Sequence, residues 1–140
     1  MNGKAKIFSP KELINSLSPL FKEQELQLVL LFGSAASGAV HRKSDLDLAF
    51  LFDKPVDILD LTNRVIRCLH TDQVDVVDLR RASPLLAFSA AKHGKILYQR
   101  SPEIFATFYS LAFRRYVDTE KLRQAQTQVV RRFVQERMER

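Results

Sequence analysis

The chain has 140 residues, of which 46% are hydrophobic and 27% charged, so it fits one compact domain with a substantial core. Its single cysteine, Cys68, excludes an internal disulfide framework and favours a reducing compartment. The N-terminus lacks the apolar segment of a signal peptide, and the apolar runs are too short to cross a bilayer. We therefore expect a cytoplasmic protein that makes no membrane contact.

The formal net charge of +6 hints at a polyanionic partner, such as nucleotide phosphates, nucleic acid or an acidic protein surface. The basic residues are scattered and form no run that reads as a nucleic-acid-binding arm. An ordinary basic surface explains the charge equally well. Nucleic acid is therefore not expected as a direct substrate.

Local signals predict the helices and strands in the first half of the chain. Ser9 and Pro10 read as an N-cap and a first-turn proline that open a helix, whose apolar stripe is Leu13, Ile14, Leu17 and Leu20. Residues 26–32 read as a strand broken by Gly33, and residues 45–52 as a second, inner strand. Pro55 is expected to open a second helix, with Ile58, Leu59, Val65, Ile66 and Leu69 on its buried side.

The second half continues the alternation of strands and helices. Residues 73–79 predict a third strand, Ser83 starts a short helix that Gly94 ends at the C′ position, and residues 95–99 predict an edge strand. From Pro102 the chain reads as helical to its end, with a late apolar patch of Val129, Val130, Phe133 and Val134 that its own domain has little surface to cover. The expected fold class is α/β (α+β), a small mixed sheet of about four strands with helices on one side.

Two aspartates interrupt the second predicted strand. Residues two apart in a strand point to the same face, so Asp45 and Asp47 share one face while their leucine neighbours enter the core. Two carboxylates this close repel each other unless a cation neutralises them. Hard carboxylate oxygens suit Mg²⁺, which substrate phosphates commonly complete. A solvated strand edge is the simpler explanation when Asp-x-Asp stands alone.

The Gly33–Ser34 pair precedes these acids, at the end of the first predicted strand. Gly33 allows the backbone to approach a ligand closely, and Ser34 offers a hydroxyl and an amide at an expected helix start, where anions bind. Phosphoryl-type transfer requires a phosphate-binding site next to a metal-binding site. Asp75 and Asp78 are three residues apart on the third predicted strand, so their side chains point to opposite faces. Only one of them can therefore face the metals.

The combined pattern, "GSAASGAVHRKSDLDL" followed by "VDVVDL", resembles the Gly-Ser-x10-Asp-x-Asp signature of the polymerase-β-like nucleotidyltransferase superfamily. The likeness covers roughly residues 10–100, and the length is similar to that of minimal (MNT) members. The resemblance implies that a nucleoside monophosphate moves from an NTP to a hydroxyl and pyrophosphate is released. It further implies the MntA-type antitoxin half of a HEPN–MNT toxin–antitoxin pair, which transfers AMP from ATP to a tyrosine of the HEPN ribonuclease toxin.

The same resemblance implies the role of each site residue. Gly33 and Ser34 would hold the triphosphate, and Asp45, Asp47 and Asp75 would be the catalytic acids that bind two Mg²⁺ ions. Many relatives carry an arginine after the Gly-Ser pair, where this chain has Ala35, Ala36 and Ser37. Phosphate binding would then depend on Arg42, Lys43 or a partner.

The resemblance also divides the chain into a minimal nucleotidyltransferase domain, residues 1–100, and a helical extension, residues 101–140, that docks on a partner within the same unit. Two alternatives stay open. The protein could neutralise a toxin by binding alone, which the missing arginine slightly favours. It could instead modify a small molecule, although such transferases usually carry an additional domain for the acceptor.

Overall fold

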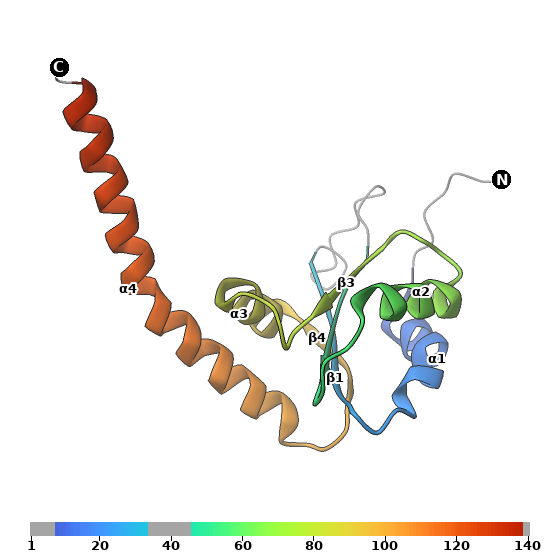
Figure 1. Ribbon diagram of the computed structural model, residues 1–140. Coiled ribbons are helices and arrows are strands. Elements are labelled where there is room, and N and C mark those ends of the chain that lie inside the picture. Colours follow the sequence, from blue (N-terminus) through green and yellow to red (C-terminus); the bar gives the residue numbers. More distant parts are fainter. Residues whose placement is uncertain (1–7, 34–45, 139–140) are drawn as a thin grey trace.

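The computed structural model describes residues 8–33 and 46–138 (Figure 1). Helices and strands alternate in the order that the sequence predicts. The elements are α1 (Pro10–Phe21), β1 (Leu26–Phe32), β2 (Leu46–Phe52), α2 (Ile58–Leu69), β3 (Val74–Asp78), α3 (Pro84–His93), β4 (Lys95–Gln99) and α4 (Ile104–Met138). Among these elements, no helix is both long enough and apolar enough to cross a membrane.

The four strands form one mixed sheet in the order β3-β2-β1-β4. β1 lies antiparallel to both β2 and β4, whereas β2 and β3 are parallel. The parallel pair requires a crossover, which α2 supplies. The predicted mixed sheet is therefore confirmed, and β4 is an edge strand as expected.

The first helix begins where the sequence indicates. The Ser9 hydroxyl accepts a hydrogen bond from the Glu12 amide at 3.2 Å, and the Glu12 carboxylate accepts one from the Ser9 amide, which completes a capping box. Leu13, Leu17 and Leu20 are buried against the sheet. This local agreement of cap, proline and apolar spacing explains why the start of α1 is readable without tertiary information.

Helices cover both faces of the sheet, and the prediction of helices on one side is wrong. The α1/α2 face carries the larger core, in which Val29, Leu48 and Phe50 pack against α1 and α2. The α3/α4 face carries a second cluster built on Leu28, Leu30, Ala49, Leu79 and Ala90, with aromatic residues from the start of α4 packed against it. Because β1 and β2 are apolar on both faces, neither face can be left to solvent. Figure 1 shows the two helical layers on opposite sides of the strands.

The second helix begins later than predicted. Its N-cap is Asp57, whose carboxylate accepts from the amides of Leu59 and Asp60 at 3.0 and 3.2 Å, so Pro55 lies outside the helix. Ile58 and Leu59, expected on the buried side, are 41% and 69% exposed. They occupy the first turn, which projects beyond the core, while the buried stripe comprises Leu61, Val65 and Leu69.

The end of α3 is also different from the prediction. Gly94 is the C-cap residue, with an extended backbone (φ −80°, ψ 155°) rather than the left-handed C′ conformation. Glycine is required here for space, because a Cβ would lie 2.3 Å from the Ala90 carbonyl oxygen. The chain therefore turns directly from helix into β4 without an intervening loop.

The last helix leaves the domain after its first few turns. Its N-terminal part packs on α3 through aromatic rings, among them Phe88 stacked on Tyr116 with centroids 4.7 Å apart. Beyond that contact the apolar side chains are exposed, including Leu122, Val129, Val130, Phe133 and Val134. Figure 1 shows α4 extending well past the rest of the molecule. The predicted late patch is thus uncovered by its own chain.

Candidate active site

The candidate site lies at one end of the sheet, where two predicted acids meet. Asp47 on β2 and Asp75 on β3 are register partners in the parallel ladder, so their side chains leave the sheet on the same face. Two residues further along, Ala49 and Val77 belong to the α3/α4 cluster. The acids therefore lie on the α3/α4 face. Asp47 is half-buried and Asp75 is exposed, which leaves the outer carboxylate open to an incoming group.

The register also separates the two candidates for the third acid. Asp78 is the partner of Phe50, a residue of the α1/α2 core, and so belongs to the opposite face of the sheet. Its carboxylate accepts a hydrogen bond from the Arg80 amide at 3.0 Å and stabilises the turn after β3. Asp75, which the family resemblance favours, is the one beside Asp47. Its catalytic role stays a prediction.

Gly33 sits directly against Asp47, one of the two acids. It follows Phe32, the register partner of Asp47, and has a left-handed backbone with φ +79°. A Cβ on this residue would lie 2.1 Å from the Asp47 Oδ2 atom. The Gly33 backbone therefore lies close to the Asp47 carboxylate, and its close approach to a ligand stays a prediction. A side chain here would displace the acid.

Five of the predicted site features lie outside the described residues. These are Ser34, Arg42, Lys43, Asp45 and the segment Ala35–Ser37 that replaces the expected arginine. The predictions for them rest on the sequence alone. For Asp45 the expectation is specific, because it precedes Asp47 by two residues and would share its face if the strand alternation continues.

The donor set suits a hard divalent cation. Asp47 and Asp75 bring two carboxylates together on neighbouring strands, and Asp45 is the expected third. Within the described residues no group of three potential ligands surrounds one point, so these two acids alone would leave coordination positions for water and phosphate oxygens. That incomplete protein shell is typical of Mg²⁺ bound together with a phosphorylated substrate.

Sequence reasoning did not predict that the start of β4 lies at the same end of the sheet as the acids. Lys95, the first residue of β4, is the register partner of Leu31, next to Phe32. Because Leu31 belongs to the α1/α2 core, Lys95 lies on the face of the sheet opposite Asp47 and Asp75. Nothing local reveals this, because the pairing of β4 with β1 joins distant segments.

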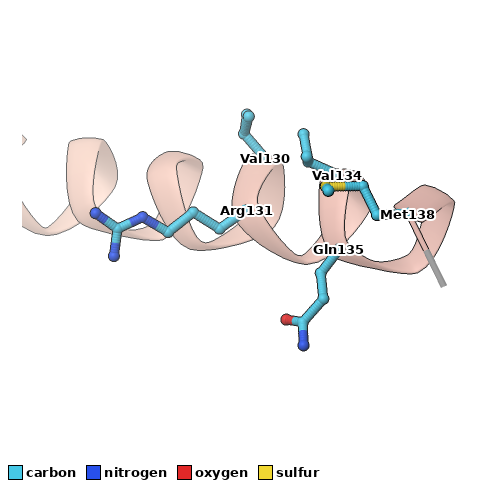
Figure 2. Close-up of a pocket in the computed structure, with 5 residues that line it drawn as sticks. All are labelled: Val130, Arg131, Val134, Gln135 and Met138. Carbon is cyan, nitrogen blue, oxygen red and sulfur yellow. The ribbon is translucent and has the colours of Figure 1, made fainter.

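A shallow apolar hollow lies far from the acids, on the last turns of α4. Figure 2 shows Val130 and Val134 projecting from one side of the helix and Gln135 from another, with Arg131 and Met138 completing the lining. One helix alone forms this hollow and cannot enclose a small molecule. We interpret it as part of the exposed apolar surface of α4.

The chain resembles proteins of known activity over most of its length. A protein adenylyltransferase MntA from Aphanizomenon flos-aquae is 27% identical over 132 residues, which are 86% of this chain and 88% of that protein. The Shewanella oneidensis protein of the same name is 40% identical over 87 residues, 59% of this chain and 62% of that protein.

Solved structures of the same kind share the fold. A crystal structure of a toxin–antitoxin with AMP-PNP matches with a TM-score of 0.74 and 31% identity, covering 88% of this chain and 98% of the other. A tri-AMPylated Shewanella oneidensis HEPN toxin in complex with MNT antitoxin matches with a TM-score of 0.70 and 28% identity, covering 87% and 98%. Residues 15–103, the greater part of the chain, match the family described as polymerase beta, nucleotidyltransferase. The chain belongs to this nucleotidyltransferase family.

Proposed function

We propose that this protein is a Mg²⁺-dependent protein adenylyltransferase that acts in the cytoplasm as an antitoxin. It transfers AMP from ATP to a tyrosine hydroxyl of a cognate HEPN ribonuclease toxin. The observation that carries the proposal is the alignment of Asp47 with Asp75, against Gly33, at the end of a nucleotidyltransferase sheet. The likeness to MntA adenylyltransferases and to a complex that contains an AMPylated HEPN toxin supports the choice of AMP and of this acceptor.

The chemistry follows from the placement of the acids. Asp45, Asp47 and Asp75 would hold Mg²⁺, which offsets the charge of the triphosphate and lowers the pKa of the attacking hydroxyl. The tyrosine oxygen forms a bond to the α-phosphorus, the bond from that phosphorus to the oxygen bridging to the β-phosphorus breaks, and pyrophosphate leaves. Asp75, the exposed carboxylate, orients the hydroxyl and accepts its proton. Gly33 and Ser34 hold the phosphates.

Residues 1–100 form the nucleotidyltransferase unit in this proposal, and residues 101–140 dock on the toxin. The exposed apolar side chains of α4 support the docking role, since a row of them including Val129 (64% exposed) and Phe133 (54%) faces solvent. Between residues 104 and 138 the helix carries seven Lys or Arg against three Asp or Glu. A helical partner with an apolar groove and an acidic rim fits such a surface.

A labelling experiment tests the transfer. The chain is incubated with α-labelled ATP, Mg²⁺ and the HEPN protein that co-purifies with it. We expect label on the partner with the wild type and with Asp78→Asn, and none with Asp47→Asn. Asp78→Asn is a matched control, because it removes a carboxylate from the same sheet but from the opposite face. Equal labelling by Asp47→Asn and wild type would exclude the site assignment.

Neutralisation by binding alone is the second candidate, and the exposed tail of α4 favours it because docking needs no chemistry. Protection of cells from the toxin separates the two. If transfer is essential, Asp47→Asn fails to protect although the complex still forms. If binding suffices, Asp47→Asn protects, whereas Val129→Ser/Phe133→Ser does not. The matched control for docking is Gln124→Ser/Gln128→Ser, two polar exposed positions on the same helix.

A further inference from the structure

The strand β3 forms one edge of the sheet, because the strand order is β3-β2-β1-β4. In a parallel ladder, every second residue directs both its N–H and its C=O group to the neighbouring strand. The Gln73 carbonyl, just before β3, accepts a hydrogen bond from the Leu46 amide of β2 at 3.1 Å. The odd-numbered residues of β3 therefore bond to β2, and the backbone groups of Val74 and Val76 point to the free edge.

This free edge lacks the usual protection against a further strand. Outside the ladder with β2, no backbone group of the described residues hydrogen-bonds to the backbone of Val74 or Val76. Natural proteins usually protect an open edge with a proline, a bulge or a charge. β3 has no proline, and its register with β2 runs without a bulge. Of its two acids, Asp75 lies beside Asp47, and Asp78 stabilises the following turn.

The two faces of β3 are covered to different extents. The side chains of Val74 and Val76 belong to the α1/α2 core, so this core holds the strand in place from one side. On the other face, α3 contacts β1, and α4 contacts β1 and β4. Asp75 is exposed on that face. The edge is therefore supported from behind, and its acid is open to a group that approaches from outside the sheet.

A strand added at this edge would bring a side chain to Asp75. Residues directly opposite each other in a sheet point to the same face, whichever way the added strand runs. Neighbouring strands lie about 4.8 Å apart, and an aromatic side chain reaches its diagonal neighbours across that gap. A tyrosine opposite Asp75 would therefore lie on the α3/α4 face, with its hydroxyl beside the carboxylate that is proposed to accept its proton.

The charges next to β3 indicate which segment would fit. Arg80 and Arg81 directly follow the strand, and both are exposed. Neither is in an ion pair among the described residues. Arg80 is five residues beyond Asp75. An acidic residue about five positions from the tyrosine of an added strand would therefore lie near these arginines and could form a charged hydrogen bond.

We propose that the free edge of β3 binds the acceptor segment of the partner as an added strand. The segment is an extended peptide with a tyrosine opposite Asp75 and acidic residues beside Arg80 and Arg81. In this mode of recognition, backbone hydrogen bonds supply affinity and alternate side chains supply specificity. The inference rests on the proposed function, because it takes a tyrosine of the HEPN toxin as the acceptor. An acceptor presented on a helix, with no strand pairing, is the competing arrangement.

The substitution Val76→Pro tests the added strand, because it removes an outward N–H that the β2–β3 ladder does not use. Val76→Ala is the matched control, since it also loses side-chain packing but keeps the N–H. The rate of labelled-AMP transfer to the co-purifying HEPN protein is measured in a single turnover. We expect Val76→Pro to be at least about tenfold slower than Val76→Ala, and both to bind Mg²⁺–AMP-PNP equally in calorimetry.

Hydrogen exchange of the wild type tests the same contact without a substitution, and it decides the matter if Val76→Pro does not fold. Exchange is compared for the chain alone and for its complex with the HEPN protein and AMP-PNP. We expect the amides of Val74 and Val76 to become protected in the complex. Those of Asp75 and Val77 should already be protected by β2. Unchanged exchange at Val74 and Val76 overturns the inference.

The acidic part of the acceptor segment is tested with Arg80→Gln/Arg81→Gln. We expect its transfer rate to fall severalfold and to lose part of its dependence on salt. The control, Lys11→Gln/Lys22→Gln, removes two exposed charges from α1, which packs against β4 at the other edge, and should transfer at the wild-type rate. A wild-type rate for the arginine variant excludes the acidic flank.

The same assays separate the failure of this inference from the failure of the proposed function. If the wild type and a folded Val76→Pro variant transfer AMP to the HEPN protein equally fast, strand addition is excluded and the proposed function stands. If the wild type transfers no AMP to that protein, the proposed function is excluded, and this inference with it.

Discussion

The substitution Gly33→Ala tests whether the Asp47 carboxylate must occupy its observed position. Alanine at φ +79° pays the steric penalty of the left-handed region, about 1 kcal/mol. Its Cβ would also lie 2.1 Å from the Asp47 Oδ2 atom and 3.1 Å from Cγ. Carbon and oxygen atoms do not approach so closely, so the carboxylate must withdraw by at least about 1 Å. Because that carboxylate ends a side chain, it can rotate away without unfolding the sheet.

Two quantities follow from this displacement. Misplacing a catalytic group by about 1 Å can lower a rate about 100-fold, and we expect that loss in the initial rate of labelled-AMP transfer. The free energy of unfolding should fall by about 2 kcal/mol, half from the backbone and half from the contact with Asp47. In an Asp47→Ala background the contact is relieved, so Gly33→Ala should cost only about 1 kcal/mol.

Comparing the double mutant with the two single mutants and the wild type tests whether Gly33 and Asp47 are in contact. Urea unfolding of the four proteins measures the coupling between Gly33 and Asp47, and the labelling assay measures the rate. A transfer rate within about threefold of the wild type would refute the reasoning, since it would mean that the Asp47 carboxylate can move without consequence. Additive effects on stability would likewise show that the two residues do not touch in solution.

Three further predictions concern stability and are checked by urea unfolding. Gly94→Ala should cost about 1–3 kcal/mol, because its Cβ meets a backbone carbonyl that cannot move aside; a neutral result would contradict the close approach. Arg100→Met should cost about 1–2 kcal/mol, since Arg100 donates to the Leu26 carbonyl at 3.0 Å and to a second carbonyl nearby; Lys at this position should recover only part. A backbone hydrogen bond, and then the hydrogen bond and charge of Lys54, lower the pKa of Glu25. Its contribution is present above the unfolded-state pKa and is lost as pH falls through the lower folded-state pKa, so Glu25→Gln should lower the urea midpoint at neutral pH and match the wild type in acid.

Local signals in the sequence predict most elements because each signal acts within a few residues. The capping box at Ser9 and the apolar run of β1 lead to the observed α1 and β1. The predicted start of α2 is wrong because Pro55 and Asp57 both indicate a helix start, two residues apart. In the structure Asp57 is the N-cap, and Pro55 lies before the helix. The helices on both faces were missed because a run that is apolar on both sides does not say what covers each side.

The sequence by itself determined which residues are candidates for the proposed chemistry. It supplies Gly33–Ser34, predicts Asp45 and Asp47 on one strand face, and leaves Asp75 and Asp78 as alternatives. Only the tertiary structure sets Asp75 beside Asp47, because the register between β2 and β3 depends on how α2 packs as it crosses between them. The same holds for the pairing of β4 with β1. Contacts between distant segments are decided by burial of the whole core, which no local pattern encodes.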